Sequence, residues 1–240
     1  MRNEILLISN LIFVYSGVLF FYYYFRKTGL YVFSSIVTII ANIEALALIN
    51  AFGMEQTLGN VLFASTFLIT DILSEIYGKE ESYLAVKLSI AVSVVFIVLS
   101  QFWLYYIPSV NDTMFPNMRQ IFTHTPRLVA ASFFVYAVSQ TFDVWAYHKW
   151  WSFTEKLCHK KEAFLWVRNN GSTLVSQLIN TILFTLCAFW GVYDNTTLAS
   201  IICSTYAIYI FTSLADTPVV YLARSLSKKQ EHNGHLRHKI

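Results

Sequence analysis

The fold class follows from a stretch near the start of the sequence, residues 5–25, which reads ILLISNLIFVYSGVLFFYYYF and ends at Arg26 and Lys27. It contains no charged residue, and about 20 such residues of helix span the hydrocarbon core of a bilayer. Working outward from it, comparable apolar runs bounded by charged or turn residues recur along the chain. We predict seven transmembrane helices, at residues 5–25, 30–49, 58–77, 85–107, 128–147, 171–192 and 197–222.

The composition of the whole chain agrees with this prediction. Of 240 residues, 56% are apolar and only 13% are charged, whereas soluble domains carry about 25% charged residues. The mean hydropathy is +0.51. These values exclude soluble enzymes, disulfide scaffolds and disordered regulators. They predict an all-α polytopic membrane helix bundle, with one transporter-sized domain at residues 1–226 and a basic tail at residues 227–240.

The distribution of positive charge predicts the orientation of the bundle. With seven crossings, only Arg2, Arg119 and Arg127 of the seventeen Lys and Arg residues lie on the side of the N-terminus. Because Lys and Arg accumulate in cytoplasmic loops, the N-terminus is predicted outside and the C-terminus in the cytoplasm. Two loops are longer. Residues 108–126 are expected to hold a short interfacial helix outside, and the aromatic and lysine-rich residues 150–162 suit an anionic inner leaflet.

Acidic residues inside the predicted spans are the strongest functional signal. A carboxylate near the centre of a spanning helix costs about 2.5 to 3.5 kcal/mol, so such residues face protein or water. The spans contain five of them: Glu44, Asp71, Glu75, Asp143 and Asp216. They lie on polar stripes with helical spacing, which predict a solvated central cavity weighted to the inner side. The basic residues expected to balance them lie at helix ends: Lys87, Arg127 and Arg168.

Structural explanations of the same residues stay open. Polar stripes often hold membrane helices together without binding anything. Asp216, which precedes Thr217 and Pro218, fits a local kink. Simple ion pairs near the interface, Glu75 with Lys79 or Arg168 with Asp143, are a further alternative.

Several kinds of chemistry lack their sequence signatures. There is no phosphate-binding G-x-x-x-x-G-K-[ST] loop, no H-E-x-x-H and no G-x-S-x-G. The three cysteines show no metal-ligand spacing, and His is confined to loops and tail. We therefore expect no enzyme activity, no metal, no cofactor and no nucleic-acid partner.

A set of short motifs carries a family resemblance. They are Gly59-Asn60, FLITDILSEIYG at 67–78, SQTFDVW at 139–145, LWVRNNGST at 165–173, SQLINT at 176–181, and Asp216-Thr217-Pro218. In order and spacing the chain resembles the queuosine precursor transporter family (vitamin uptake transporter type) over roughly residues 29–226. The resemblance implies a multi-pass importer in the bacterial inner membrane that carries 7-deazaguanine bases such as preQ0, preQ1 or queuine.

These bases suit the polar residues of the spans. Some of them bear a cationic amine, which carboxylates can hold, and all have a flat ring whose edge amides can read. The hypothesis is that the substrate site or its gate is formed by Asp71, Glu75, Gln140, Asp143, Arg168, Asn169, Asn170 and Gln177. Coupling or gating is assigned to Glu44, Asn180 and Asp216. At position 180 the family usually has an acid, so a charge-dependent role of that position is open.

Three other functions compete with this one. The chain also fits the substrate-binding membrane subunit of an energy-coupling-factor system, in which a separate ATPase, an unknown partner here, drives uptake. A membrane enzyme acting on a lipid fits less well, because the spans contain no buried His and no nucleophile motif. A purely structural protein also fits less well, because it would not need a carboxylate on so many separate spans.

Overall fold

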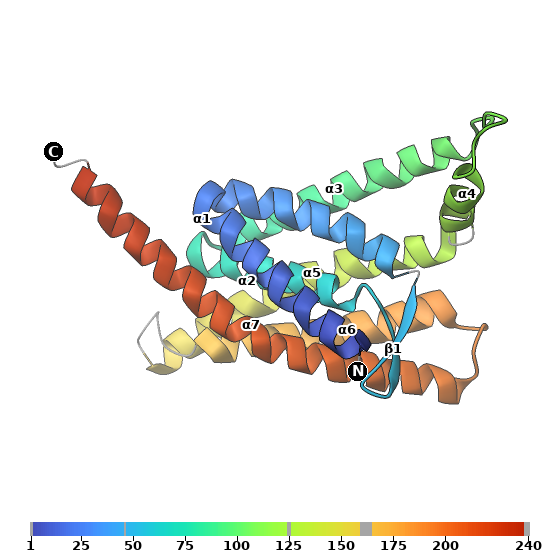
Figure 1. Cartoon of the computed structure of the whole chain (residues 1–240). Coiled ribbons are helices and arrows are strands. Elements are labelled where there is room, and N and C mark those ends of the chain that lie inside the picture. The colour runs from blue at the N-terminus through green and yellow to red at the C-terminus, as the bar shows by residue number, and fades with distance from the viewer. Residues whose placement is uncertain (1, 46, 124–125, 159–164, 238–240) are drawn as a thin grey trace.

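The computed structural model describes residues 2–45, 47–123, 126–158 and 165–237. Its elements are, in order, α1 (Arg2–Glu44), β1 (Leu48–Ala51), β2 (Met54–Thr57), α2 (Asn60–Ile76), α3 (Lys79–Trp103), α4 (Phe115–Thr123), α5 (Pro126–Cys158), α6 (Leu165–Phe189) and α7 (Asn195–Arg237). The long helices form one elongated bundle (Figure 1). A helix bundle was predicted; the two short strands were not.

Helix α1 consists of two helical arms that run in opposite directions from a sharp bend. Arg26 has a φ of 57° and a ψ of −140°, which breaks the helix, and the chain doubles back there (Figure 1). The two arms match the first two predicted spans. At the bend, Lys27 forms a 3.0 Å ion pair with Glu81 at the start of α3, so this bend and the α2–α3 turn lie at the same end of the bundle.

The second arm is shorter than predicted. It ends at Glu44, and residues 48–51 form strand β1, which pairs with β2 in antiparallel register. Phe52 and Gly53 connect the strands and both have positive φ, as the favoured two-residue hairpin turns require. Asn3 Nδ2 donates to the carbonyl oxygen of Asn50 over 2.9 Å. The hairpin therefore covers the end of the bundle that holds the N-terminus.

Helix α2 is the central helix. Every residue from Asn60 to Ser74 is buried, and α2 packs against α1, α3, α5 and α7. It approaches α1 closely because Gly59 lacks a side chain: a Cβ there would lie 2.6 Å from the carbonyl oxygen of Ala41. Since all faces of α2 are covered, polar residues on it contact protein rather than lipid.

The outer faces of the bundle are apolar. Phe13 and Phe211, on α1 and α7, are 78% and 63% exposed. In the described part of the chain, four helices are long and apolar enough to cross a membrane: α1, α3, α6 and α7. Because α1 is broken at Arg26, the helical segments run back and forth in the order of the seven predicted spans. The number of crossings and their orientation stay predictions.

The remaining elements differ from the predicted boundaries. A short helix between residues 108 and 126 is confirmed as α4, whose Phe122 contacts Phe96 and Trp103 of α3. Residues 150–158 continue α5 as helix, and residues 159–162 lie outside the described residues. The predicted boundary at residue 226 falls inside α7, which runs on to Arg237.

Helix α7 has a defined start. Asp194 accepts hydrogen bonds from the backbone of Thr196 and Thr197 and from the Thr197 hydroxyl, which satisfies free N–H groups of the first turn. These hydrogen bonds lower the pKa of Asp194.

Candidate functional site

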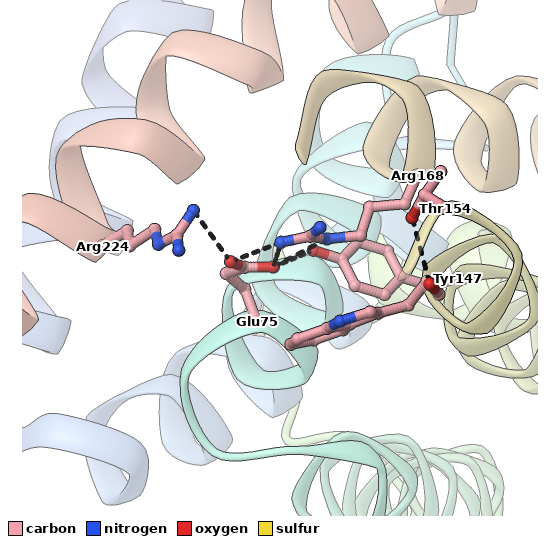
Figure 2. Close-up of polar contacts among 6 residues, drawn as sticks. Glu75, Tyr147, Thr154, Arg168 and Arg224 are labelled. Atoms are coloured by element: carbon pink, nitrogen blue, oxygen red, sulfur yellow. Dashed lines mark hydrogen bonds and ion pairs between the residues drawn. The ribbon is translucent and has the colours of Figure 1, made fainter. Parts of the chain in front are cut away.

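An ion-pair network, here called the Glu75 cluster, joins four helices at the end of the bundle that holds Arg26. It consists of Glu75 (α2), Tyr147 (α5), Arg168 (α6) and Arg224 (α7), and Figure 2 shows the two arginines approaching the carboxylate from opposite sides. Arg168 Nη2 lies 2.6 Å from Glu75 Oε2, and Arg224 Nη1 lies 3.4 Å from Oε1. The Tyr147 hydroxyl donates to Oε2 over 2.8 Å.

The Glu75 cluster is tightly fixed. Arg168 also binds Oε2 through Nε at 2.9 Å, and its guanidinium lies 4.3 Å from the ring centroid of Trp151. The side chains of Arg168 and Glu75 are 0% and 3% exposed. The two arginines balance the negative charge of Glu75, and the donors around it occupy its oxygens. Glu75 therefore has little capacity left for a cationic ligand. The sequence had suggested two other pairs, Glu75 with Lys79 and Arg168 with Asp143. In the structure Glu75 pairs with Arg168 instead.

One helical turn deeper in the bundle lies a second group of acids, here called the aspartate cluster. It consists of Asp71 (α2), Asp143 (α5) and Asp216 (α7), with Asn169 and Gln177 (α6); all five are fully buried. Thr173 Oγ1 donates to Asp71 Oδ2 over 2.9 Å, and Ser176 Oγ donates to Asp143 Oδ1 over 2.8 Å. Asp71 lies near enough to Asp143 and Asp216 to interact with them electrostatically.

The aspartate cluster contains many polar atoms without a hydrogen-bond partner. They are Asp71 Oδ1, Asp143 Oδ2, Asn169 Oδ1, both amide atoms of Gln177 and both carboxyl oxygens of Asp216. The Tyr15 hydroxyl lies beside Asp216 and donates to the carbonyl oxygen of Thr212 over 3.4 Å. Buried polar groups are normally satisfied. Their concentration in one place makes the aspartate cluster the candidate ligand-binding site.

Further polar residues extend this site in both directions. On one side, Asn170 Nδ2 donates to Thr217 Oγ1 over 2.7 Å, next to Asp216. On the other, Gln140 Nε2 donates to Thr66 Oγ1 over 2.6 Å. Beyond Gln140, Ser139 donates to Asn180 over 3.1 Å. A column of polar side chains thus runs along α2, α5, α6 and α7.

Only part of the predicted arrangement is reproduced. Nine of the eleven candidate residues lie in the Glu75 cluster, the aspartate cluster or the contacts next to them, and Asn180 lies further along the column. Glu44 does not belong to this group, because it is the last residue of α1, beside the hairpin at the opposite end. The predicted solvated cavity is not open in this conformation, since the side chains of the aspartate cluster are 0% exposed.

Some contributing residues were not predicted. Arg224 was assigned only to the cytoplasmic surface, although it lies only about two helical turns after Asp216 on α7. Thr66, the partner of Gln140, could not be predicted as part of the site from the sequence, because a threonine in an apolar helix commonly forms a hydrogen bond to the backbone of its own helix. Among the described residues, no three His, Cys, Asp or Glu side chains are grouped to hold a metal ion.

The sequence was compared with known proteins. A family model described as "Putative vitamin uptake transporter" matches residues 57–223. A protein of Bacillus subtilis (strain 168) named "Probable queuosine precursor transporter" is 34% identical over 217 residues, which are 90% of this chain and 93% of the relative. The chain belongs to the vitamin uptake transporter family.

Membership of the vitamin uptake transporter family confirms the resemblance found in the sequence motifs. The matched residues contain α2, α3, α5 and α6 in full and both clusters except Arg224. The protein is a multi-pass membrane transporter and not an enzyme. No solved structure gives a significant match to this vitamin uptake transporter.

Proposed function

We propose that the protein imports queuosine precursors, 7-deazaguanine bases such as preQ0, preQ1 or queuine, across the bacterial inner membrane. The observation that carries this proposal is the aspartate cluster: a closed group of acids and amides with unpartnered atoms at the centre of a bundle. Support for the substrate comes from the Bacillus subtilis relative, whose name gives queuosine precursors as its cargo.

In this proposal the two clusters have different roles. Asp71, Asp143, Asn169 and Gln177 bind the base, and Gln140 and Asn170 complete the site. The Glu75 cluster closes the inner end, because its ion pairs join α2, α5, α6 and α7. Release of substrate then requires separation of Glu75 from Arg168 and Arg224. Asp216 acts in coupling, and Asn180 and Glu44 act in gating on the outer side.

The proposed orientation has seven crossings, the N-terminus outside and the C-terminus inside. It places the Glu75 cluster toward the cytoplasm. Reporter fusions test it: a fluorescent protein fused after Arg237 should fluoresce, whereas alkaline phosphatase at the same position should stay inactive.

Restoration of queuosine in tRNA tests the proposed substrate. A cell that cannot synthesise the precursors and lacks its own importer is supplied with each precursor in turn at low concentration. Expression of the protein should restore queuosine with at least one precursor. Failure with every precursor, at verified membrane expression, would refute the assignment.

Uptake in a second host tests the source of energy. We propose that the protein transports without an ATPase subunit. Uptake should therefore persist in a host that lacks energy-coupling-factor ATPases; loss of uptake there would support the energy-coupling-factor alternative.

A further inference from the structure

A groove that opens to the outside of the bundle lies between α5 and α6. Its volume is about 580 Å³, which is within the range of ligand-binding pockets. The residues that line it include, from α5, Trp145, Lys149, Trp150 and Phe153 and, from α6, Gly171 and Val175. Trp145, Phe153 and Val175 are exposed. In a transmembrane bundle, apolar surface of this kind faces lipid.

The groove is a fixed feature of the contact between α5 and α6. A Cβ at Gly171 would lie 3.1 Å from the indole ring of Trp150, so this ring rests directly on the backbone of α6. On α5 the lining residues recur every three or four positions from Phe142 to Phe153, which places them on one face of the helix. The groove therefore runs lengthwise along α5 for about three turns.

The groove crosses the predicted boundary of the membrane. Phe142 and Val175 lie inside the predicted spans, whereas Lys149 lies two residues beyond residue 147, where the predicted span of α5 ends. Trp145 and Trp150 lie on either side of that end. Tryptophan is enriched at this level of membrane proteins, where the acyl chains meet the headgroups.

The charge of the groove is positive and lies at its headgroup end. Lys149 is exposed, and its Nζ lies 5.8 Å from the ring centroid of Trp145. Lys156, also exposed, follows seven residues later on the same face of α5. None of the described residues that line the groove is acidic. An apolar groove with a lysine at the headgroup level matches a lipid whose headgroup carries net negative charge.

We infer that this groove binds an anionic phospholipid, with an acyl chain along the aromatic face of α5 and the phosphate at Lys149. A zwitterionic headgroup presents a positive group beside its phosphate, so it gains less from the lysine. The groove contains no residue of the Glu75 cluster or the aspartate cluster, so this inference is independent of the proposed cargo.

The bound lipid would support the inner contact between α5 and α6. Tyr147 precedes Lys149 by two residues, and Arg168 precedes Gly171 by three, so the groove adjoins two members of the Glu75 cluster. A ligand that binds only the folded protein raises its stability. Anionic lipid should therefore raise the melting temperature.

Native mass spectrometry of the full chain in detergent tests the selectivity, with phosphatidylglycerol and phosphatidylcholine of identical acyl chains. The unmodified protein should bind phosphatidylglycerol about fivefold more tightly, the factor expected for one lysine at an anionic headgroup. Lys149→Gln should bring this ratio close to one. Lys87→Gln, at an exposed position of α3 outside the groove, is the matched control and should keep the ratio.

A second variant tests the place of the acyl chain. Val175→Trp fills the groove and should abolish the binding of phosphatidylglycerol and the rise in melting temperature that this lipid causes. Val95→Trp, at an exposed position of α3 outside the groove, should keep both. Because Lys149 is exposed, Lys149→Gln tests the inference even where Val175→Trp does not fold.

Three outcomes would overturn the inference. Equal binding of the two lipids by the unmodified protein would remove the selection for an anionic headgroup. Equal effects of Lys149→Gln and Lys87→Gln would indicate a general attraction of lipid to surface charge. A lipid-free dimer that Val175→Trp abolishes would show that a second copy of the chain covers the groove.

Discussion

Glu75 and Asp71 are both buried carboxylates on the same face of α2, one turn apart, yet their surroundings are opposite. Glu75 is contacted by Arg168, Arg224 and Tyr147, which leave it neutralised and fixed. Asp71 receives one hydroxyl, from Thr173, and keeps an oxygen without a partner. The comparison teaches that burial of an acid does not reveal its role. Its partners are more informative, because a satisfied charge stabilises the bundle, whereas an acid with an unpartnered oxygen is a candidate for ligand binding.

Breaking the Glu75 cluster should have the largest effect. Glu75→Gln leaves the buried Arg168 against a neutral side chain, and loss of one partner of a buried pair costs about 3 to 5 kcal/mol. We expect a clear fall in the melting temperature of the detergent-solubilised protein. Glu80→Gln on the exposed start of α3 should leave it unchanged. A melting temperature of Glu75→Gln equal to that of the unmodified protein would contradict a stabilising role for the cluster.

Substitutions in the aspartate cluster should lower uptake without lowering the melting temperature, in contrast to Glu75→Gln. Asp71→Asn combined with Asp143→Asn removes two carboxylates of the proposed site, and we expect uptake of an amine-bearing precursor to fall about 100-fold. The melting temperature should stay the same or rise, since two buried carboxylates that lack a basic partner are removed. Uptake and melting are measured on the same preparations. Normal uptake by the double variant would remove these two acids from the site.

The hydroxyl groups test how the carboxylates are held. Thr173→Val and Ser176→Ala each delete one hydrogen bond to an acid of the aspartate cluster, a change of about 1 kcal/mol and hence roughly fivefold in affinity. Ser65→Ala is a suitable control, because the Ser65 hydroxyl bonds only to the backbone of its own helix. An effect of Ser65→Ala as large as the other two would indicate general loosening instead of an oriented site.

Replacement of Trp151 should have the smallest effect. Its ring lies against the Arg168 guanidinium, and such a contact contributes about 0.5 to 2 kcal/mol. Trp151→Leu should lower the melting temperature less than Glu75→Gln does. Trp166→Leu, at a position where the ring is 55% exposed, provides the control. If both tryptophan variants melt alike, the stacking on Arg168 adds nothing to the cluster.

Much of the helical architecture was predictable, for a clear physical reason. An apolar run of about 20 residues has few alternatives to a spanning helix, and each predicted run falls largely within a helix. The hairpin at 48–57 was not predictable by hydropathy, because apolar residues such as Leu48 and Ile49 suit a strand as well as a helix end. The extensions of α5 and α7 were missed because polar helices outside a membrane carry no hydropathy signal.

The candidate site was predictable in its residues but not in its pairing. Acids within apolar helices stand out because they are costly in lipid, and this signal identified Asp71, Asp143 and Asp216. Spacing along one helix cannot show which side chain of another helix lies opposite. The choice of Glu75 over Asp143 as the partner of Arg168 therefore required the arrangement of α2, α5 and α6 in three dimensions.

The length of α7 has a mechanical consequence. Its 43 residues extend about 65 Å, roughly twice the thickness of the hydrocarbon core, and its last part leaves the bundle (Figure 1). Pro218 interrupts its hydrogen bonding beside Asp216, and about 28 Å of helix follows. A change of about 10° in bend at Pro218 would displace the far end by about 5 Å. The projecting part of α7 would thus amplify a small movement. A spin label near its far end would report movement of Arg224 away from Glu75 as a measurable change in its distance from a label on the bundle.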